Sequence, residues 1–278
     1  MSSRYEFLGK TSFGQYIPGT TWFHDRDPRA RLIAILLLFV GVLFSPEPVG
    51  LTLGLVSILC LYLLAKLPLR PSLVGIRRAI PFILILAMLQ IIFYTTKQGE
   101  SVLFSVIGIN VTWSSLINAL MLIYRFLVLI LLINALVMSI STAQITAALF
   151  HLLKPFEKFG FPVNDLTMVV QITLRYLPII AQIAEKIAKA QASRGGDWEQ
   201  RGFNPIRQAK RVLPLLVPII INSLKRAETM AVAMESRGFN AAEERSSYYS
   251  LHFIWQDALL IMIPLLLSVF MLLYGRIF

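Results

Sequence analysis

The stretch SSLINALMLIYRFLVLILLINALVM, from Ser114 to Met138, decides the fold of this chain, and Arg125 is its only charged residue. A helix needs roughly 20 mostly apolar residues to cross about 30 Å of hydrocarbon, so this stretch is long enough to span a membrane. The whole chain agrees, because 56% of its residues are hydrophobic, 15% are charged and the mean hydropathy is +0.70. We therefore expect an integral membrane protein.

Working outward from this stretch, further apolar segments are predicted to span the membrane. They are Arg31–Pro46, Val49–Ala65, Ile80–Thr96 and Phe253–Tyr274. Cytoplasmic loops are enriched in Lys and Arg, and basic residues are frequent in the leader and between residues 66 and 78 but scarce in 45–50 and 97–113. The N terminus is therefore predicted to be cytoplasmic, and the C terminus to lie outside.

The charge and the reactive side chains argue against several classes of protein. The net charge is +11, but the basic residues lie beside apolar spans, which favours a membrane surface or a protein partner over nucleic acid. Cys60 is the only cysteine, so no internal disulfide can form. His24, His151 and His252 lack metal-site spacing, and no nucleophile–base pair is evident. We expect no catalytic residue, no metal site and no cofactor bound by this chain.

The segment between the fourth and the last predicted span combines charge with long apolar runs. A capping box at Ser141–Gln144 predicts a short helix that ends near Phe159. Two longer helices are predicted, one over 164–194 and one over 205–237, the second with Asn204 as N-cap and proline at its first position. We predict that these three helices form a cytoplasmic platform.

An alternative topology would pass residues 166–183 and 212–224 through the membrane. It would place the basic segment 184–211 outside, against the bias of Lys and Arg towards the cytoplasm. We therefore prefer the cytoplasmic platform. The predicted domains are a leader with four spans (1–138), a cytoplasmic helical domain (139–251) and a C-terminal span (252–278).

The two long helices end in the same three residues. Pro178-Ile179-Ile180 leads to Ser193-Arg194-Gly195, and Pro218-Ile219-Ile220 leads to Ser236-Arg237-Gly238. A single Ser-Arg-Gly is typical of a helix C-cap, with glycine left-handed and arginine complementing the helix dipole. Its repetition on two helices that lack cover favours a protein contact, because an arginine fork can bind carboxylates and helix-end carbonyls. Two similar ends predict two similar partner sites.

These residues resemble the transmembrane T component of energy-coupling factor (ECF) transporters, which carries two Ala-Arg-Gly-like motifs at the ends of crossing coupling helices. The segment HDRDPRARL is similar to the family's His-x-x-Asp-Pro-Arg-x-Lys pattern at His24, Asp27, Pro28 and Arg29, with Arg31 in place of lysine. LRYLP, with Arg175 and Pro178, and AQASRG, at 190–195, are similar to the first coupling helix. Ser193 and Ser236 replace the usual alanine.

The resemblance implies an all-α integral membrane protein with about five transmembrane helices and a platform of three coupling helices, two of them long and crossing. It also implies a non-catalytic subunit of a bacterial cytoplasmic membrane. That subunit would join two ABC-type ATPases, identical or homologous and loaded with ATP-Mg, to a small membrane-embedded substrate-binding S component that takes up vitamins or other micronutrients.

The same resemblance assigns roles to particular residues. Arg194 and Arg237, with their flanking serines and glycines, would dock in grooves of the two ATPases. The S component would contact apolar coupling-helix residues, namely Leu166, Val170, Leu213, Leu216, Val217 and Ile220.

Other functions stay open at this stage. A self-contained secondary transporter or channel would usually show acidic residues within its spans, and here only Asp257 lies at the start of one. Arg125 lies in the middle of a span, where it is equally consistent with a functional role and with a packing hydrogen bond. The GxxxG pattern of Gly50 and Gly54 favours close packing within the bundle over dimerisation.

Overall fold

The computed structural model describes residues 16–17, 19, 21–94, 102–106, 109–160, 162–194, 205–239 and 253–277. The chain divides into two compact units. The bundle unit comprises residues 14–155 and 251–278, and the helix-pair unit is centred on residues 156–250. In the described residues both units are built mainly from helices, which confirms the predicted all-α class.

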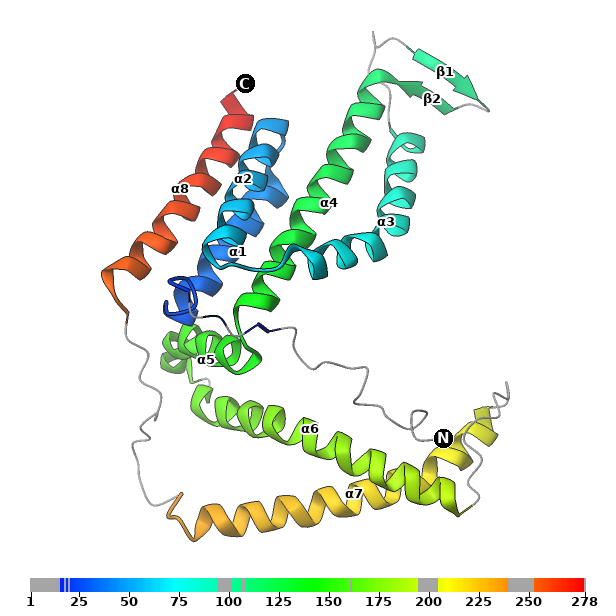
Figure 1. Ribbon diagram of the computed structural model, residues 1–278, viewed down its shortest axis with the longest axis vertical. Coiled ribbons are helices and arrows are strands. Elements are labelled where there is room, and N and C mark those ends of the chain that lie inside the picture. The colour runs from blue at the N-terminus through cyan, green and yellow to red at the C-terminus, as the bar shows by residue number, and fades with distance from the viewer. Residues whose placement is uncertain are drawn as a thin grey trace. The chain divides into compact units, whose positions relative to one another are not determined.

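The bundle unit contains every segment that the sequence predicts as a membrane span (Figure 1). Its helices are α1 (Pro28–Phe44), α2 (Pro48–Leu64), α3 (Leu69–Ile92), α4 (Trp113–Ser139), α5 (Thr142–Leu153) and α8 (Trp255–Ile277). Both α1 and α2 begin with proline, whose missing N–H costs no hydrogen bond in the first turn. The predicted and observed bounds agree closely, except at the start of α3.

Helix α3 begins at Leu69, well before the predicted start at Ile80. The prediction followed the apolar run alone, whereas the basic residues Arg77 and Arg78 continue the same helix. Pro81 lies inside α3, and Figure 1 shows the helix bent. A proline removes one helical hydrogen bond and bends a helix without ending it where packing holds both halves.

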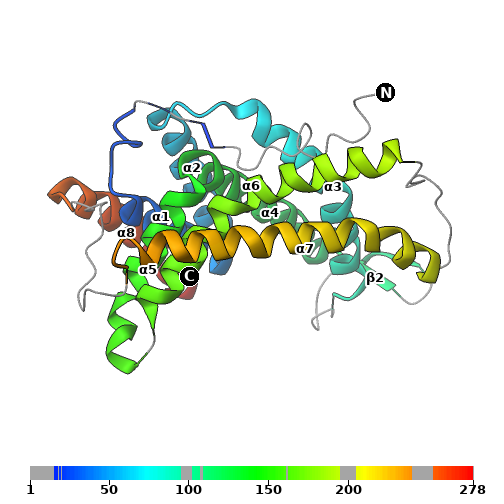
Figure 2. The same cartoon turned by 90° about the horizontal axis from the view of Figure 1, so that it is seen from below.

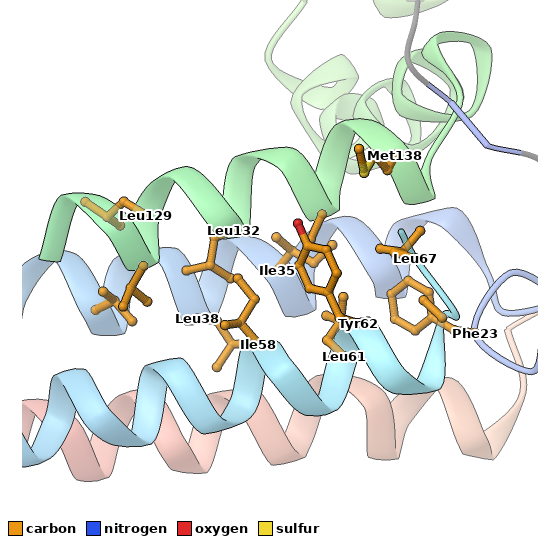
Figure 3. Close-up of a cluster of buried hydrophobic side chains, with 14 of the residues drawn as sticks. Phe23, Ile35, Leu38, Ile58, Leu61, Tyr62, Leu67, Leu129, Leu132 and Met138 are labelled. Atoms are coloured by element: carbon orange, nitrogen blue, oxygen red, sulfur yellow. The ribbon is translucent and has the colours of Figure 1, made fainter. Parts of the chain in front are cut away.

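The core of the bundle unit lies between α1, α2 and α4. Figure 3 shows its buried side chains, which include Leu38, Ile58 and Leu132 from these three helices. Glycines bring the helices closer still: a Cβ on Gly54 would lie 2.5 Å from Val42 Cγ2, and one on Gly50 would meet Ser45 Oγ. Both glycines therefore serve packing within one chain, which supports the first of the two interpretations of the GxxxG pattern.

A short β-hairpin precedes α4, and the sequence analysis did not predict it. Strands β1 (Val102–Val106) and β2 (Ile109–Thr112) pair antiparallel, with Val106 opposite Ile109. Their β-branched residues favour strands, but each run is too short to stand out beside the long apolar helices. Thr112 then caps α4, in a reciprocal capping box with Ser115.

Helix lengths define which elements can cross a bilayer. Among the described helices, α3, α4, α8 and the helix α6 (Val163–Ser193) are long and apolar enough to do so. Helices α1 and α2 have 17 residues each, which is about 25 Å and slightly short of the hydrocarbon thickness. The presence of α6 in this set means that length and composition leave the alternative topology open. The cytoplasmic location of the platform stays a prediction.

The three predicted platform helices all form. Helix α5 begins with the predicted capping box, in which Gln144 N donates to Ser141 Oγ at 3.3 Å and Ser141 N to Gln144 Oε1 at 3.1 Å. The 3₁₀ helix η2 (Lys154–Phe159) follows, and the chain turns at Gly160, which has a φ of 83°. That left-handed conformation favours glycine and ends the helix where the sequence predicts.

The helix-pair unit consists of α6 and α7 (Pro205–Glu235). The two helices lie side by side and run in opposite directions (Figures 1 and 2). Tyr176 Oη of α6 lies 3.3 Å from Met230 Sδ of α7 and donates a hydrogen bond across the pair. Pro178 lies inside α6, and Pro214 and Pro218 inside α7. The predicted cap Asn204 is outside the described residues.

Candidate functional site

The end of α6 presents an exposed arginine held by local hydrogen bonds. Ser193 Oγ donates to Ala190 O at 2.8 Å, and Arg194 N donates to Gln191 O at 3.2 Å. Both Ser193 and Arg194 are exposed. Gly195, the third residue of the motif, lies outside the described residues. The serine hydroxyl satisfies a carbonyl that the helix end leaves without a partner. The arginine therefore follows directly after a hydrogen-bonded last turn of the helix.

The end of α7 has the same local geometry. Ser236 Oγ donates to Ala233 O at 3.0 Å, and Arg237 N donates to Met234 O at 3.1 Å. Gly238 has a φ of 71°, and Phe239 N donates to Met234 O at 3.1 Å. These bonds form a Schellman-type C-cap. The cap and the exposed arginine coexist, so the capping interpretation explains the glycine and the serine but leaves the guanidinium of Arg237 available.

The two ends, which we call the arginine tips, lie at opposite ends of the helix pair because α6 and α7 are antiparallel (Figure 1). Each helix has 31 residues, and at 1.5 Å per residue this is about 45 Å. One compact partner site could not hold both tips. The geometry fits two separate partner sites.

The helices also carry exposed apolar side chains. On α7 they recur at a spacing of three and four residues and so form one stripe along the helix, which we call the α7 stripe. Its members are Leu213, Leu216, Val217, Ile220, Ile221 and Leu224. Leu213 and Ile220 are each 60% exposed. On α6, Leu166 is exposed and Val170 is partly buried. Apolar surface of this extent normally has a membrane or a protein partner.

The motif at the start of α1 is mainly structural. Asp27 is buried and caps α1 by accepting a hydrogen bond from Arg29 N at 2.9 Å, and Pro28 occupies the first helical position. Arg29 Nε lies 3.9 Å from Asp27 Oδ1. Arg31 is only 1% exposed and donates from Nη1 to Ser139 O at 2.9 Å. Arg31 therefore ties the start of α1 to the last residue of α4.

His24 belongs to the same region and has no described metal partner group nearby. Its Nδ1 lies 2.7 Å from Thr21 Oγ1, and its ring packs under Gly19. Burial lowers the pKa of His24, and the charge of Arg31 lowers it further. Among the described residues, no group of three or more His, Cys, Asp and Glu side chains is arranged to hold a metal ion.

Two other predicted motif residues lie on α6. Arg175 is exposed on the helix surface, and Pro178 lies inside the helix. The structure does not bring Arg175 to either arginine tip, since it lies in the middle of α6.

Sequence reasoning assigned no role to two residues of the bundle unit. Asp257 of α8 is 1% exposed, and its Oδ1 accepts a hydrogen bond from Asp27 N at 3.3 Å. Ser139 offers the carbonyl that binds Arg31. An isolated acid at the start of a span was the only signal for Asp257, and nothing in the local sequence marks the Ser139 carbonyl.

Arg125 of α4 makes a hydrogen bond inside the bundle. Its Nη2 donates to Ser45 O at 2.5 Å, and Ser45 is the C-cap of α1. This contact mirrors that of Arg31, since each arginine binds a carbonyl at the C-terminal end of the other helix, where the helix dipole favours positive charge. The geometry supports the packing interpretation of Arg125.

The long apolar helices and the charged helix pair define a multi-pass membrane protein with exposed arginine tips. Comparison with known proteins identifies the family within this class. Residues 19–248 match the model of the CbiQ family, described as cobalt transport protein. The chain belongs to this family.

Curated relatives cover nearly the whole chain. The energy-coupling factor transporter transmembrane protein EcfT of Lactococcus lactis subsp. cremoris is 30% identical over 95% of this chain and 97% of its own. The EcfT protein of Bacillus subtilis is 33% identical over 92% of this chain and 94% of its own. The EcfT protein of Staphylococcus aureus is 33% identical over 96% of this chain and 99% of its own. These relatives confirm the resemblance that the motifs indicate.

Proposed function

We propose that this chain is the transmembrane coupling subunit of an ECF-type importer. It transmits the ATP-driven closure of two cytosolic ATPases to a membrane-embedded S component, which carries the substrate. The observation that carries the proposal is the pair of arginine tips, built alike and placed at opposite ends of one antiparallel helix pair. Family membership and the names of the relatives support it.

The two ATPases are the proposed partners of the arginine tips. In each tip a serine hydroxyl donates to a carbonyl of the last helical turn, and the neighbouring exposed arginine presents a guanidinium that can bind carboxylates or helix-end carbonyls bidentately. Two ATPases, identical or homologous, supply two such sites. When they close on ATP-Mg, the tips move towards one another, and α6 and α7 move with them. Hydrolysis takes place in the ATPases, and this chain binds no cofactor itself.

The S component is the proposed partner of the apolar surface. The α7 stripe and Leu166 of α6 present exposed apolar side chains on the elements that the ATPases would move. A small membrane protein that covers this surface would be reoriented as the helices shift. Substrate choice then lies with the S component, and vitamins or other micronutrients, cobalt included, are the candidate cargo.

Charge reversal at the arginine tips tests this assignment. Arg194→Glu and Arg237→Glu should each weaken ATPase docking by about 2 to 5 kcal/mol, because a charged anchor is then buried against the wrong charge. The measurement is the yield of ATPase subunits that co-purify with the tagged chain from its native membrane, together with ATP-dependent uptake.

Matched controls lie on the same helices. Lys186→Glu on α6 and Arg226→Glu on α7 reverse exposed charges away from the tips, and both should leave the ATPase yield unchanged. Normal yield and uptake in both tip variants would remove the docking role. A lone chain that transports in liposomes without ATP would instead favour a self-contained secondary transporter or channel.

A further inference from the structure

A buried polar network joins three helix ends of the bundle unit. Asp257, near the start of α8, accepts hydrogen bonds from Ile254 N at 2.9 Å on Oδ2 and from Asp27 N at 3.3 Å on Oδ1. It therefore caps its own helix and binds the residue that caps α1. Asp257 is 1% exposed and Asp27 is 6% exposed, so both carboxylates have left water almost completely.

Arg31 supplies the positive charge of this network. It is also 1% exposed, and its backbone N donates a hydrogen bond to Asp27 O at 3.2 Å in the first turn of α1. Its Nη1 donates to Ser139 O, at the end of α4. The neighbouring carbonyl, Met138 O, accepts a hydrogen bond from Ile17 N at 3.1 Å. The end of α4 is thus held both by α1 and by the leader.

A second contact lies at the rim of the network. Arg26 Nη1 donates to Gln256 Oε1, and the guanidinium of Arg26 lies 5.0 Å from the ring centre of Trp22. This contact ties the leader to α8 without a buried carboxylate. The network and its rim therefore connect the leader, α1, α4 and α8 through hydrogen bonds of both side chains and backbone groups.

In the sequence, the network lies close to where the chain leaves the bundle unit and to where it returns to it, so it can transmit movement. In chain order, α6 and α7 follow α4 and α5 and precede α8. Arg31 holds the end of α4, and Asp257 holds the start of α8. On the exit side, Ile140, the C-cap of α4, and Ala148 of α5 are buried against Leu32 of α1. Both connections are therefore fixed to the same turn of α1.

We propose that Asp27, Arg31 and Asp257 are positioning residues that anchor both connections, so that displacement of α6 and α7 becomes displacement of the bundle unit. Without this anchor, the ends of α4 and α8 would yield separately and the movement would be lost locally. This inference rests on the proposed function, but it makes a separate claim about residues that touch neither an ATPase nor an S component in that proposal.

The first test replaces Asp257 with asparagine, which keeps the shape and removes the charge and one of the two acceptors. The complex is purified with its ATPases and S component and reconstituted in liposomes. The measured quantity is the coupling ratio, the amount of substrate imported per ATP hydrolysed. The probe is whichever of a panel of tritiated B vitamins and radioactive cobalt the wild-type liposomes accumulate.

We expect the Asp257→Asn complex to keep its ATP hydrolysis and to lose coupling by about fivefold or more, as expected for a coupling free energy between distant sites. Gln256→Met, which removes only the rim contact, should lower the ratio less. It leaves Asp27, Arg31 and Asp257 unchanged, so it decides the question if the Asp257→Asn chain fails to assemble. Amide hydrogen exchange at Ile254 and Asp27 should quicken in Asp257→Asn, which confirms locally that the bonds are broken.

The control is a variant that weakens the bundle elsewhere. Leu51→Ala opens the core at a fully buried site on α2, a helix that supplies no residue to the network, and it should reduce the amount of complex while leaving the coupling ratio unchanged. A wild-type ratio in both Asp257→Asn and Gln256→Met, or an equal loss in Leu51→Ala, overturns the anchor. Absence of ATPases from the wild-type preparation would overturn the proposed function instead.

Discussion

At the scale of single residues, Arg125 shows how a charge is accommodated inside the bundle. It binds the Ser45 carbonyl through Nη2, while its buried Nε has no hydrogen-bond partner within the described chain. Such a group is expensive to hold away from water, and the helix end that it caps offsets part of that cost.

Replacement of Arg125 separates the packing and the functional interpretations. Arg125→Met should lower the stability of the chain by about 1.5 to 3 kcal/mol, the range for a hydrogen bond to a charged group. Thermal unfolding in detergent measures this loss. Ser45→Ala is the control: it keeps the carbonyl that binds Arg125 and removes only the 3.3 Å bond from Ser45 Oγ to Glu47 O, so the loss should be smaller. Loss of transport at unchanged stability would favour the functional interpretation.

The pH dependence of stability should reveal His24. Burial lowers the pKa of its imidazole in the folded state, and Arg31 adds to the effect, so the folded chain binds fewer protons than the unfolded chain as the pH falls. Stability should therefore be unaffected by His24 well above pH 6.5 and should decrease as the pH falls through about 6.5 and below. Apparent unfolding temperatures between about pH 7.5 and pH 5.5 test this.

His24→Asn should flatten part of that decrease, because the amide oxygen can still accept from Thr21 but does not titrate. His151 is the internal comparison: burial lowers its pKa, and Arg29 and Lys154 lower it further. His151→Asn should remove a different part of the decrease in stability at low pH. An unchanged pH profile in His24→Asn would contradict the assignment to this residue.

At the scale of elements, the contact between α1 and α8 depends on one missing side chain. A Cβ on Gly41 would lie 2.8 Å from Ser268 Cβ and 2.9 Å from Ser268 Cα. Gly41→Ala should therefore push the two helices apart and cost about 1 to 3 kcal/mol by overpacking. Thermal unfolding measures the loss.

Gly75→Ala in α3 is the matched control. Its new Cβ would meet only the end of the Asn134 side chain, at 3.2 Å from Nδ2, which can turn away. Alanine is favoured over glycine in a helix by about 1 kcal/mol, so this variant should be as stable as the wild type or more so. Equal losses at Gly41 and Gly75 would show that the close contact with Ser268 does not cause the loss at Gly41.

The sequence predicts elements better than it predicts their contacts. Local signals such as the Ser141 capping box and Pro205 mark helix starts because the interactions lie within one turn. The predicted start of α3 was too late because the first turns of this helix contain basic residues, which the search for an apolar span excluded. The bond from Arg31 to Ser139 joins residues 108 positions apart, and that from Asp27 to Asp257 joins residues 230 apart. No local pattern contains that information, although the family motif contains Asp27 and the position of Arg31.

At the scale of the whole molecule, the distribution of Lys and Arg predicts that the helix pair lies on the cytoplasmic side of the membrane. Lys186 is exposed on α6, within the segment that the two topologies place on opposite sides. In a Cys60→Ser background, Lys186→Cys should react with a membrane-impermeant maleimide in inverted vesicles and not in intact cells, as the distribution of Lys and Arg predicts.

Glu47→Cys provides the opposite control, because the loop between α1 and α2 is predicted to lie outside and should react in intact cells. The same pair of measurements establishes the predicted cytoplasmic N terminus, since α1 lies between the leader and this loop. Labelling of Lys186→Cys from outside would overturn the platform and the proposed function with it.

The helical build of the arginine tips imposes a rule on chain length. Each residue added to a helix turns everything beyond it by about 100° around the axis. One residue inserted into α6 between Pro178 and Ser193 would therefore turn Arg194 away from its proposed ATPase site, whereas four would return it to within about 40° of its original direction but advance it by about 6 Å. Transport activity should thus vary periodically with the number of residues inserted into α6, and it should be retained best when the insertion is close to a whole number of helical turns.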